Sequence, residues 1–328
     1  MRHDVKHDIL LVEPMLAEIE ARLDAAYQVT RLFAPDGARA ADQSAGRIRA
    51  VVTGGGTGLS PDWFEKLPSL GLVAVNGVGT DKVDLDLARR RGIHVSTTPG
   101  VLTDDVADLG MALILGVMRR LGQGDRLVRS GAWGAGETLP LGSSLTGKRL
   151  GILGFGQIGR ALAGRAEAFG MKVAYWNRSA VEASESYRRC ETAVGLATEC
   201  DILAVCVAGT AGTERMVGNE ILSALGADGV LVNIARGSVV DEEALIAALK
   251  GGTIAAAGLD VFVGEPNIRP EFLALDNVLL MPHQGSATIE TRLAMGELVL
   301  ANLDAFFKGE TPPTSVIRGE RRASAGTR

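Results

Sequence analysis

The sequence predicts an α/β fold built from two doubly wound parallel sheets, and three observations support this. Short apolar runs alternate with amphipathic helical patterns along almost the whole chain, as in parallel sheets covered by helices on both faces. The strand-like runs are continuously apolar, which is typical of strands buried on both faces. The 328 residues also exceed what one hydrophobic core usually serves, so we expect two domains.

The expected strands form two series. The first series comprises residues 9–12, 50–53, 72–75 and 94–96. The second comprises residues 149–153, 172–176, 202–207, 230–234, 255–260 and 278–281. Two long helices are predicted besides, one over residues 104–120 with Thr103 as its cap and one over residues 288–308.

Composition narrows the class of protein. The net charge is -5, with 46% hydrophobic and 22% charged residues, and no basic stripe is present, which argues against nucleic-acid binding. The first apolar run is too short for a signal peptide or a membrane span. The three cysteines form no CxxC pair, so we predict no disulfide framework and no metal site. A reducing cytoplasm is the expected location.

A glycine motif predicts a dinucleotide site. Residues 154–159 read Gly-Phe-Gly-Gln-Ile-Gly, directly after an expected strand and at the start of an expected helix. Gly154 and Gly156 would let the main chain approach a pyrophosphate, while Gly159 would let the helix pack on the strand. This spacing is that of a Rossmann domain. A second glycine cluster, residues 54–58, lacks the ending of a phosphate-binding P-loop and is expected to be a turn.

The residues after the next strand predict which cofactor binds. An acidic residue there would favour NADH, but the sequence has Asn177, Arg178 and Ser179. A neutral amide, a guanidinium and a hydroxyl suit the 2′-phosphate, so we expect NADP(H) to be favoured over NAD(H). The alternative is a solvated turn that accepts either cofactor.

Three side chains follow three different strands and are candidates for acid–base chemistry. Arg236, Glu265 and His283 each come just after an expected strand, where parallel sheets place their ligand crevice. A hydride transferred to a ketone requires a proton donor, and histidine suits that role near neutral pH. The alternatives are a structural histidine, a surface arginine and a glutamate that caps a turn.

Five ordered segments together resemble the D-isomer-specific 2-hydroxyacid dehydrogenase family, over nearly the whole chain. These segments are residues 76–84 (NGVGTDKVD), 154–159 (GFGQIG), 233–242 (NIARGSVVDE), 258–266 (GLDVFVGEP) and 282–288 (PHQGSAT). Within the family, the sequence is most similar to glyoxylate/hydroxypyruvate reductases, on residues 51–54, residues 177–179 and Trp133.

The resemblance implies a role for each matching residue at the substrate. Arg236 would orient the substrate, Glu265 would pair with His283, and His283 would be the acid–base residue. Main-chain N–H groups near Val78 and Gly79 would hold the substrate carboxylate.

The resemblance also implies cofactor contacts and an assembly. Asp260 would face the nicotinamide amide, and the other cofactor contacts would come from Gln157, Ile158, Val207, Ile234, Ala235 and Gly285. A homodimer is implied, whose long helices near residues 106–119 pack together. Trp133 would enter the partner's active site, or else be an ordinary interface or core aromatic. Residues 206–209 (CVAG) depart from the Cys-Pro or Leu-Pro turn of many members.

The implied domains are a flavodoxin-like substrate domain and a Rossmann cofactor domain. The substrate domain would comprise residues 1–100 and a return helix over 288–318, the cofactor domain 101–287, and a flexible tail 319–328. The implied reaction reduces a glyoxylate- or hydroxypyruvate-type 2-oxo acid to a D-2-hydroxy acid. Alternatives are a D-lactate or sugar-acid dehydrogenase, and a cofactor-sensing scaffold without turnover. Family members that act on formate carry Gln at the position of Glu265, and members that act on phosphite carry Lys at the position of Val78. The resemblance therefore implies neither formate nor phosphite as the substrate.

Overall fold

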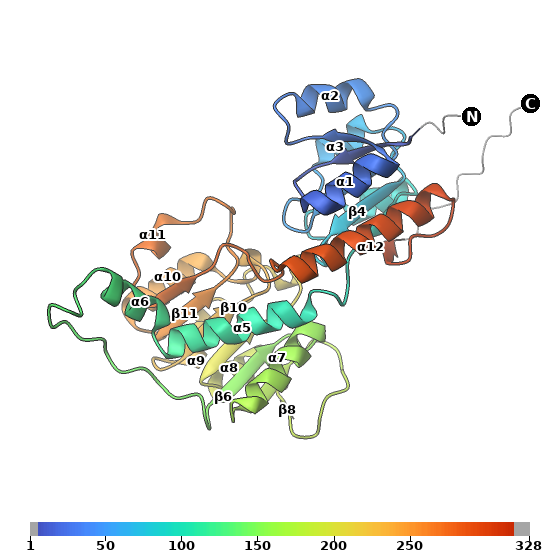
Figure 1. The fold of residues 1–328 in the computed structure, drawn as a ribbon. Helices are drawn as coiled ribbons and strands as arrows, with labels where there is room; N and C mark the ends of the chain where they lie inside the picture. The colour runs from blue at the N-terminus through green and yellow to red at the C-terminus, as the bar shows by residue number, and fades with distance from the viewer. Residues whose placement is uncertain (1–5, 318–328) are drawn as a thin grey trace, which may run out of the picture. The chain divides into compact units, whose positions relative to one another are not determined.

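The computed structural model describes residues 6–317, which divide into two compact units. Unit 1 takes the chain up to Leu102 and again from Ala287, and unit 2 spans Thr103–Ser286. Each unit holds a mainly parallel sheet with helices on both faces, so the predicted fold class is confirmed (Figure 1). The tail expected at residues 319–328 lies outside the described residues.

Unit 1 contains a six-stranded sheet of flavodoxin-like order. The strands run β2-β1-β3-β4-β5-β13, and only β13 is antiparallel to its neighbour. Their bounds are β1 Asp8–Leu11, β2 Gln28–Arg31, β3 Ala50–Gly54, β4 Leu72–Asn76, β5 His94–Ser96 and β13 Ser315–Ile317. The four strands expected in this unit are present. The edge strands β2 and β13 carry no continuous apolar run and were not expected from the pattern.

Helices cover both faces of this sheet. On one face, α1 (Ala17–Ala26) and α12 (Ile289–Phe307) bury Leu23, Val299 and Leu303 against β1, β3 and β4. On the other lie α2 (Gly37–Ser44), α3 (Pro61–Lys66) and α4 (Leu85–Arg90). The Thr288 hydroxyl accepts a hydrogen bond from the Thr291 N–H and caps α12, so the expected last helix is confirmed.

Unit 2 contains a seven-stranded, all-parallel sheet of Rossmann order. The strands run β8-β7-β6-β9-β10-β11-β12. Their bounds are β6 Arg149–Leu153, β7 Lys172–Trp176, β8 Arg188–Arg189, β9 Ile202–Val205, β10 Val230–Asn233, β11 Ala256–Leu259 and β12 Val278–Leu280. The six expected strands are confirmed. Because the order reverses between β6 and β9, a ligand crevice is expected at their carboxyl ends.

Two layers of helices enclose the second sheet (Figure 1). On one face, α5 (Thr103–Met118) packs against α7 (Gln157–Ala168) and across β10 and β11. On the other lie α8 (Ala193–Glu199), α9 (Asn219–Leu225) and α10 (Glu242–Gly251). The short α11 (Pro270–Leu273) precedes β12.

The first long helix differs from its prediction at both ends. Helix α5 already includes Thr103, so Thr103 is its first residue rather than its cap. It stops at Met118, and Arg120 has a φ of 55°. This left-handed residue interrupts the helix before α6 (Leu121–Arg129), which the glycine-rich sequence did not predict. None of the helices within residues 6–317 has the length and apolarity needed to cross a membrane.

Candidate active site

The predicted cofactor and acid–base residues of unit 2 follow the strands at one edge of its sheet. The glycine loop follows β6 and Asn177 follows β7, while Arg236, Glu265 and His283 follow β10, β11 and β12. All these strands are parallel, so their carboxyl ends meet at the same edge.

The glycine loop has the shape that a dinucleotide requires. Gly154 has a φ of +100°, and a Cβ there would lie 2.6 Å from the main-chain nitrogen of Val207. A Cβ on Gly159 would lie 2.3 Å from the Gly154 oxygen, so only glycine lets α7 sit this close to β6. A Cβ on Gly156, the N-cap of α7, would meet nothing within 4 Å. The loop therefore leaves free space at the N-terminus of α7, where a dinucleotide pyrophosphate commonly binds.

The turn after β7 is tied to the glycine loop by Asn177. Its Oδ1 accepts a hydrogen bond from the Phe155 N–H at 3.1 Å, and its Nδ2 donates to the Ser179 carbonyl oxygen at 3.0 Å. Sequence reasoning assigned this amide to the cofactor and missed its link to the loop. Arg178 and Ser179 are exposed beside it. Asn177 thus fixes the base of the turn that carries the guanidinium and the hydroxyl.

His283 and Glu265 form a direct pair. The Nδ1 atom of His283 lies 2.7 Å from Oε2 of Glu265, and the other carboxylate oxygen accepts the Phe262 N–H at 2.7 Å. With Nδ1 so engaged, Nε2 is the ring atom that can exchange a proton with a ligand. His283 has a φ of 54°, a backbone conformation that few residues other than glycine adopt. The hydrogen bond between Nδ1 and the Glu265 carboxylate fixes the orientation of the imidazole ring.

The surroundings of Glu265 keep it ionised. Burial has the largest single effect and raises the pKa of Glu265. The hydrogen bonds from His283 and Phe262, with the charges of His283 and Arg236, together outweigh it, so the pKa of Glu265 lies below its ordinary value. The Arg236 guanidinium is thus one of the positive charges that favour the ionised form of this carboxylate. Its Nη1 also donates to the Ala235 carbonyl oxygen at 2.8 Å.

A depressed pKa makes the stability conferred by Glu265 depend on pH. The contribution is present above the unfolded-state pKa of the carboxyl and is lost as pH falls through the lower folded-state pKa. We expect Glu265→Gln to be less stable than the wild type at pH 7, with a difference that shrinks as the solution is acidified below the ordinary pKa of glutamate. Denaturant unfolding of both proteins across this range measures the difference. A difference that grows on acidification would contradict the prediction.

Asp260 anchors the loop that carries His283. Its side chain is buried, and its two oxygens accept the N–H groups of Gln284 at 2.6 Å and Gly285 at 2.9 Å. Burial raises the pKa of Asp260 above its ordinary value, although these two hydrogen bonds act to lower it. Its main-chain oxygen also accepts the His283 N–H at 2.8 Å. The family resemblance implied a place for Asp260 at the nicotinamide, and the sequence did not predict that Asp260 positions the histidine loop.

The remaining predicted residues lie as follows. Ile234 and Ala235 are buried at the end of β10. Val78 and Gly79 belong to unit 1, in the loop after β4, and the Val78 side chain is exposed. Trp133 follows α6 and is also exposed, at 65%.

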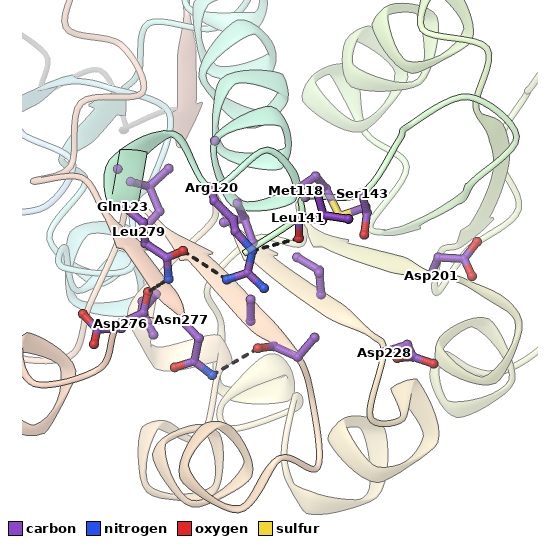
Figure 2. Close-up of a pocket in the computed structure, with 18 of the residues that line it drawn as sticks. Met118, Arg120, Gln123, Leu141, Ser143, Asp201, Asp228, Asp276, Asn277 and Leu279 are labelled. Carbon is purple, nitrogen blue, oxygen red and sulfur yellow. Dashed lines mark hydrogen bonds between the residues drawn. The ribbon is translucent and has the colours of Figure 1, made fainter. Parts of the chain in front are cut away.

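Unit 2 also has a hollow of about 420 Å³ at the opposite edge of the sheet, beneath α6 (Figure 2). Two of its polar side chains are already hydrogen-bonded: the Arg120 guanidinium donates to Gln123 and to the Leu141 carbonyl oxygen, and Gln123 donates to the Asp276 carbonyl oxygen. Because it lies at the amino ends of the strands, it is separate from the His283 edge.

Known proteins resemble this chain over most of its length. A 2-ketogluconate reductase of Gluconobacter oxydans is 47% identical over 312 residues, covering 95% of this chain and 99% of that protein. A glyoxylate/hydroxypyruvate reductase of Arabidopsis thaliana is 42% identical, covering 94% and 98%.

A solved structure shares the fold as well as the sequence. The NADPH-dependent glyoxylate/hydroxypyruvate reductase of Sinorhizobium meliloti, in complex with NADP and malonate, is 40% identical with a TM-score of 0.90, covering 97% of this chain and 99% of that one. Residues 111–285 match the family model described as "D-isomer specific 2-hydroxyacid dehydrogenase, NAD binding domain". The protein therefore belongs to the D-isomer-specific 2-hydroxyacid dehydrogenase family.

Proposed function

We propose that this enzyme reduces a small 2-oxo acid of the glyoxylate or hydroxypyruvate type to the 2-hydroxy acid with a nicotinamide cofactor, and that the product has the D configuration where it is chiral. The observation that carries the proposal is the His283–Glu265 pair, influenced by the charge of Arg236, at the carboxyl edge of a dinucleotide-binding sheet. An imidazole held by a carboxylate supplies the proton that ketone reduction consumes. The names of the relatives agree with this chemistry.

In the proposed mechanism, unit 1 is the substrate domain and unit 2 the cofactor domain. When bound, the reduced nicotinamide supplies the hydride that the keto carbon accepts. The N–H groups of Val78 and Gly79 hold the substrate carboxylate, and Arg236 polarises the keto oxygen. Protonated His283 then gives its Nε2 proton to that oxygen while Glu265 stabilises the imidazolium.

Steady-state oxidation of NADPH with glyoxylate and hydroxypyruvate tests the proposed function. Turnover with either acid supports it, and chiral analysis of the hydroxypyruvate product reports the D configuration. Failure to turn over any 2-oxo acid would contradict it and would favour a protein that senses the cofactor without using it.

We further propose that NADP(H) is preferred, because Arg178 and Ser179 contact the 2′-phosphate. Arg178→Ala removes a charge-assisted contact that only NADPH can make, so the KM for NADPH should rise about tenfold to a hundredfold while that for NADH stays unchanged. Initial rates with both cofactors measure this. Arg189→Ala, an exposed arginine on β8, is the matched control. Equal effects of Arg178→Ala on the two cofactors would argue against the phosphate contact.

We also propose a homodimer in which Trp133 enters the partner's active site. Several large apolar side chains are exposed on α6 and the segment after it, namely Leu121, Val128, Trp133, Leu139 and Leu141. An apolar surface of this kind is typical of a protein interface.

A cytoplasmic location fits the free thiols of Cys190 and Cys200, which are buried.

A further inference from the structure

The relatives differ in the size of the substrates for which they are named, from glyoxylate to 2-ketogluconate. Glyoxylate has no carbon beyond the keto carbon, whereas 2-ketogluconate continues through four hydroxylated carbons. A residue that distinguishes them must lie within reach of these distal carbons when the substrate carboxylate is bound, and it must be able to bind hydroxyl groups. In unit 1, the relevant sheet edge is the one beside Val78 and Gly79, where the substrate carboxylate is proposed to bind.

A carboxylate lies at that edge, over the end of the strand next to β4. Strand β3 lies between β1 and β4, and Gly54 pairs with Asn76 in the parallel register. Glu13, just after β1, extends its side chain over the end of β3: a Cβ on Gly54 would lie 1.9 Å from Glu13 Oε1. A larger residue at position 54 would therefore displace the carboxylate from this place. Strands β1 and β4 are two strand spacings apart, about 10 Å, and the Glu13 side chain covers part of that distance by extending over β3.

The glycine cluster after β3 holds this carboxylate in place. The Gly58 N–H donates to the Gly54 carbonyl oxygen at 2.9 Å, which closes residues 54–58 into the expected turn. The hydroxyl of Thr57, within the turn, donates a hydrogen bond to Glu13 Oε2. Gly77 abuts the same turn, since a Cβ there would lie 3.3 Å from the Gly55 nitrogen. The turn therefore connects Glu13 to the start of the Val78 loop.

The chemistry of this arrangement favours one class of ligand. An ionised carboxylate only accepts hydrogen bonds, and each of its oxygens has room for more than one. Glu13 is half-buried, so a hydroxyl group reaching it finds an acceptor that is already oriented. A second carboxylate at this place would be repelled, which disfavours dicarboxylic 2-oxo acids.

We propose that Glu13, oriented by Thr57 and accommodated by Gly54, accepts hydrogen bonds from the distal hydroxyl groups of a polyhydroxylated 2-oxo acid. This inference rests on the proposed function, because it requires the substrate carboxylate to bind at Val78 and Gly79. Glu13 is then a specificity residue, and sugar-derived 2-oxo acids are substrates of the enzyme beside glyoxylate.

The test compares kcat/KM for 2-ketogluconate with that for glyoxylate. Loss of a hydrogen bond to a charged acceptor should lower kcat/KM for 2-ketogluconate about tenfold to a hundredfold in Glu13→Ala, with glyoxylate unchanged. Glu13→Gln keeps one acceptor oxygen and should lose less. Gly54→Ala, which places a methyl group where the carboxylate lies, should reproduce the selective loss. Glu18→Ala, an exposed glutamate on α1, is the control.

The outcomes separate this inference from the proposed function. Equal losses on both substrates in Glu13→Ala would overturn the specificity role. So would a wild-type enzyme that reduces glyoxylate but not 2-ketogluconate, while leaving the proposed function intact. A wild-type enzyme that reduces no 2-oxo acid would overturn the proposed function, and this inference with it.

Discussion

Replacing His283 with asparagine is expected to lower kcat about 100-fold to 10,000-fold, the range over which general acid catalysis contributes. Asparagine can still accept or donate a hydrogen bond towards Glu265, but it cannot hold a transferable proton. The glycine loop and the Asn177 turn are untouched, so NADPH should bind as tightly as before. Stopped-flow or steady-state rates with glyoxylate give kcat, and fluorescence titration gives the Kd for NADPH.

The result is specific to the position of the histidine. His7→Asn, an exposed histidine of unit 1, should leave both kcat and the Kd for NADPH unchanged. If His283→Asn retained more than about a tenth of the wild-type kcat, another group would have to supply the proton. If the Kd for NADPH rose as much as kcat fell, the residue would be structural.

Much of the fold was predictable because buried parallel strands are continuously apolar. The ten strands predicted from such runs are all present, since both faces of each are covered by helices. The edge strands β2 and β8 escaped prediction for the converse reason: Gln28–Arg31 and Arg188–Arg189 are polar and partly exposed. Helix α6 was not predicted because it contains two glycines, which disfavour helix, and because it starts directly after Arg120, whose left-handed conformation the sequence does not reveal.

The candidate site was predictable only in part. Residues that follow parallel strands had to share an edge, which brought Arg236, Glu265 and His283 into one hypothesis. The hydrogen bonds among neighbours could not be predicted. That Asp260 accepts the N–H groups of Gln284 and Gly285 depends on how two loops fold. The place of Glu13 over Gly54 depends on side-chain direction at residues 41 positions apart, which no local pattern encodes.

Arg236→Ala is expected to lower kcat/KM about 100-fold to 1,000-fold, the effect of removing one donor from a developing oxyanion. Lysine should substitute poorly, because it keeps the charge but loses the planar, forked donor. Added guanidinium should restore part of the activity of Arg236→Ala and none of that of His283→Asn. Rates with and without guanidinium measure this rescue. Arg215→Lys is the control, since Arg215 pairs with Asp241 at 2.6 Å.

Gly209 provides an independent test of how Arg236 is positioned. A Cβ at Gly209 would lie 2.8 Å from Arg236 Cγ, so Gly209→Ala must displace the guanidinium without removing it. We expect a smaller loss than in Arg236→Ala, and no rescue by guanidinium, because the displaced side chain still occupies the site. If Arg236→Ala changed only the KM for NADPH, the guanidinium would act on the cofactor rather than on the keto oxygen. A loss confined to kcat/KM for the 2-oxo acid assigns it to the reacting carbonyl, beside the proton that His283 delivers.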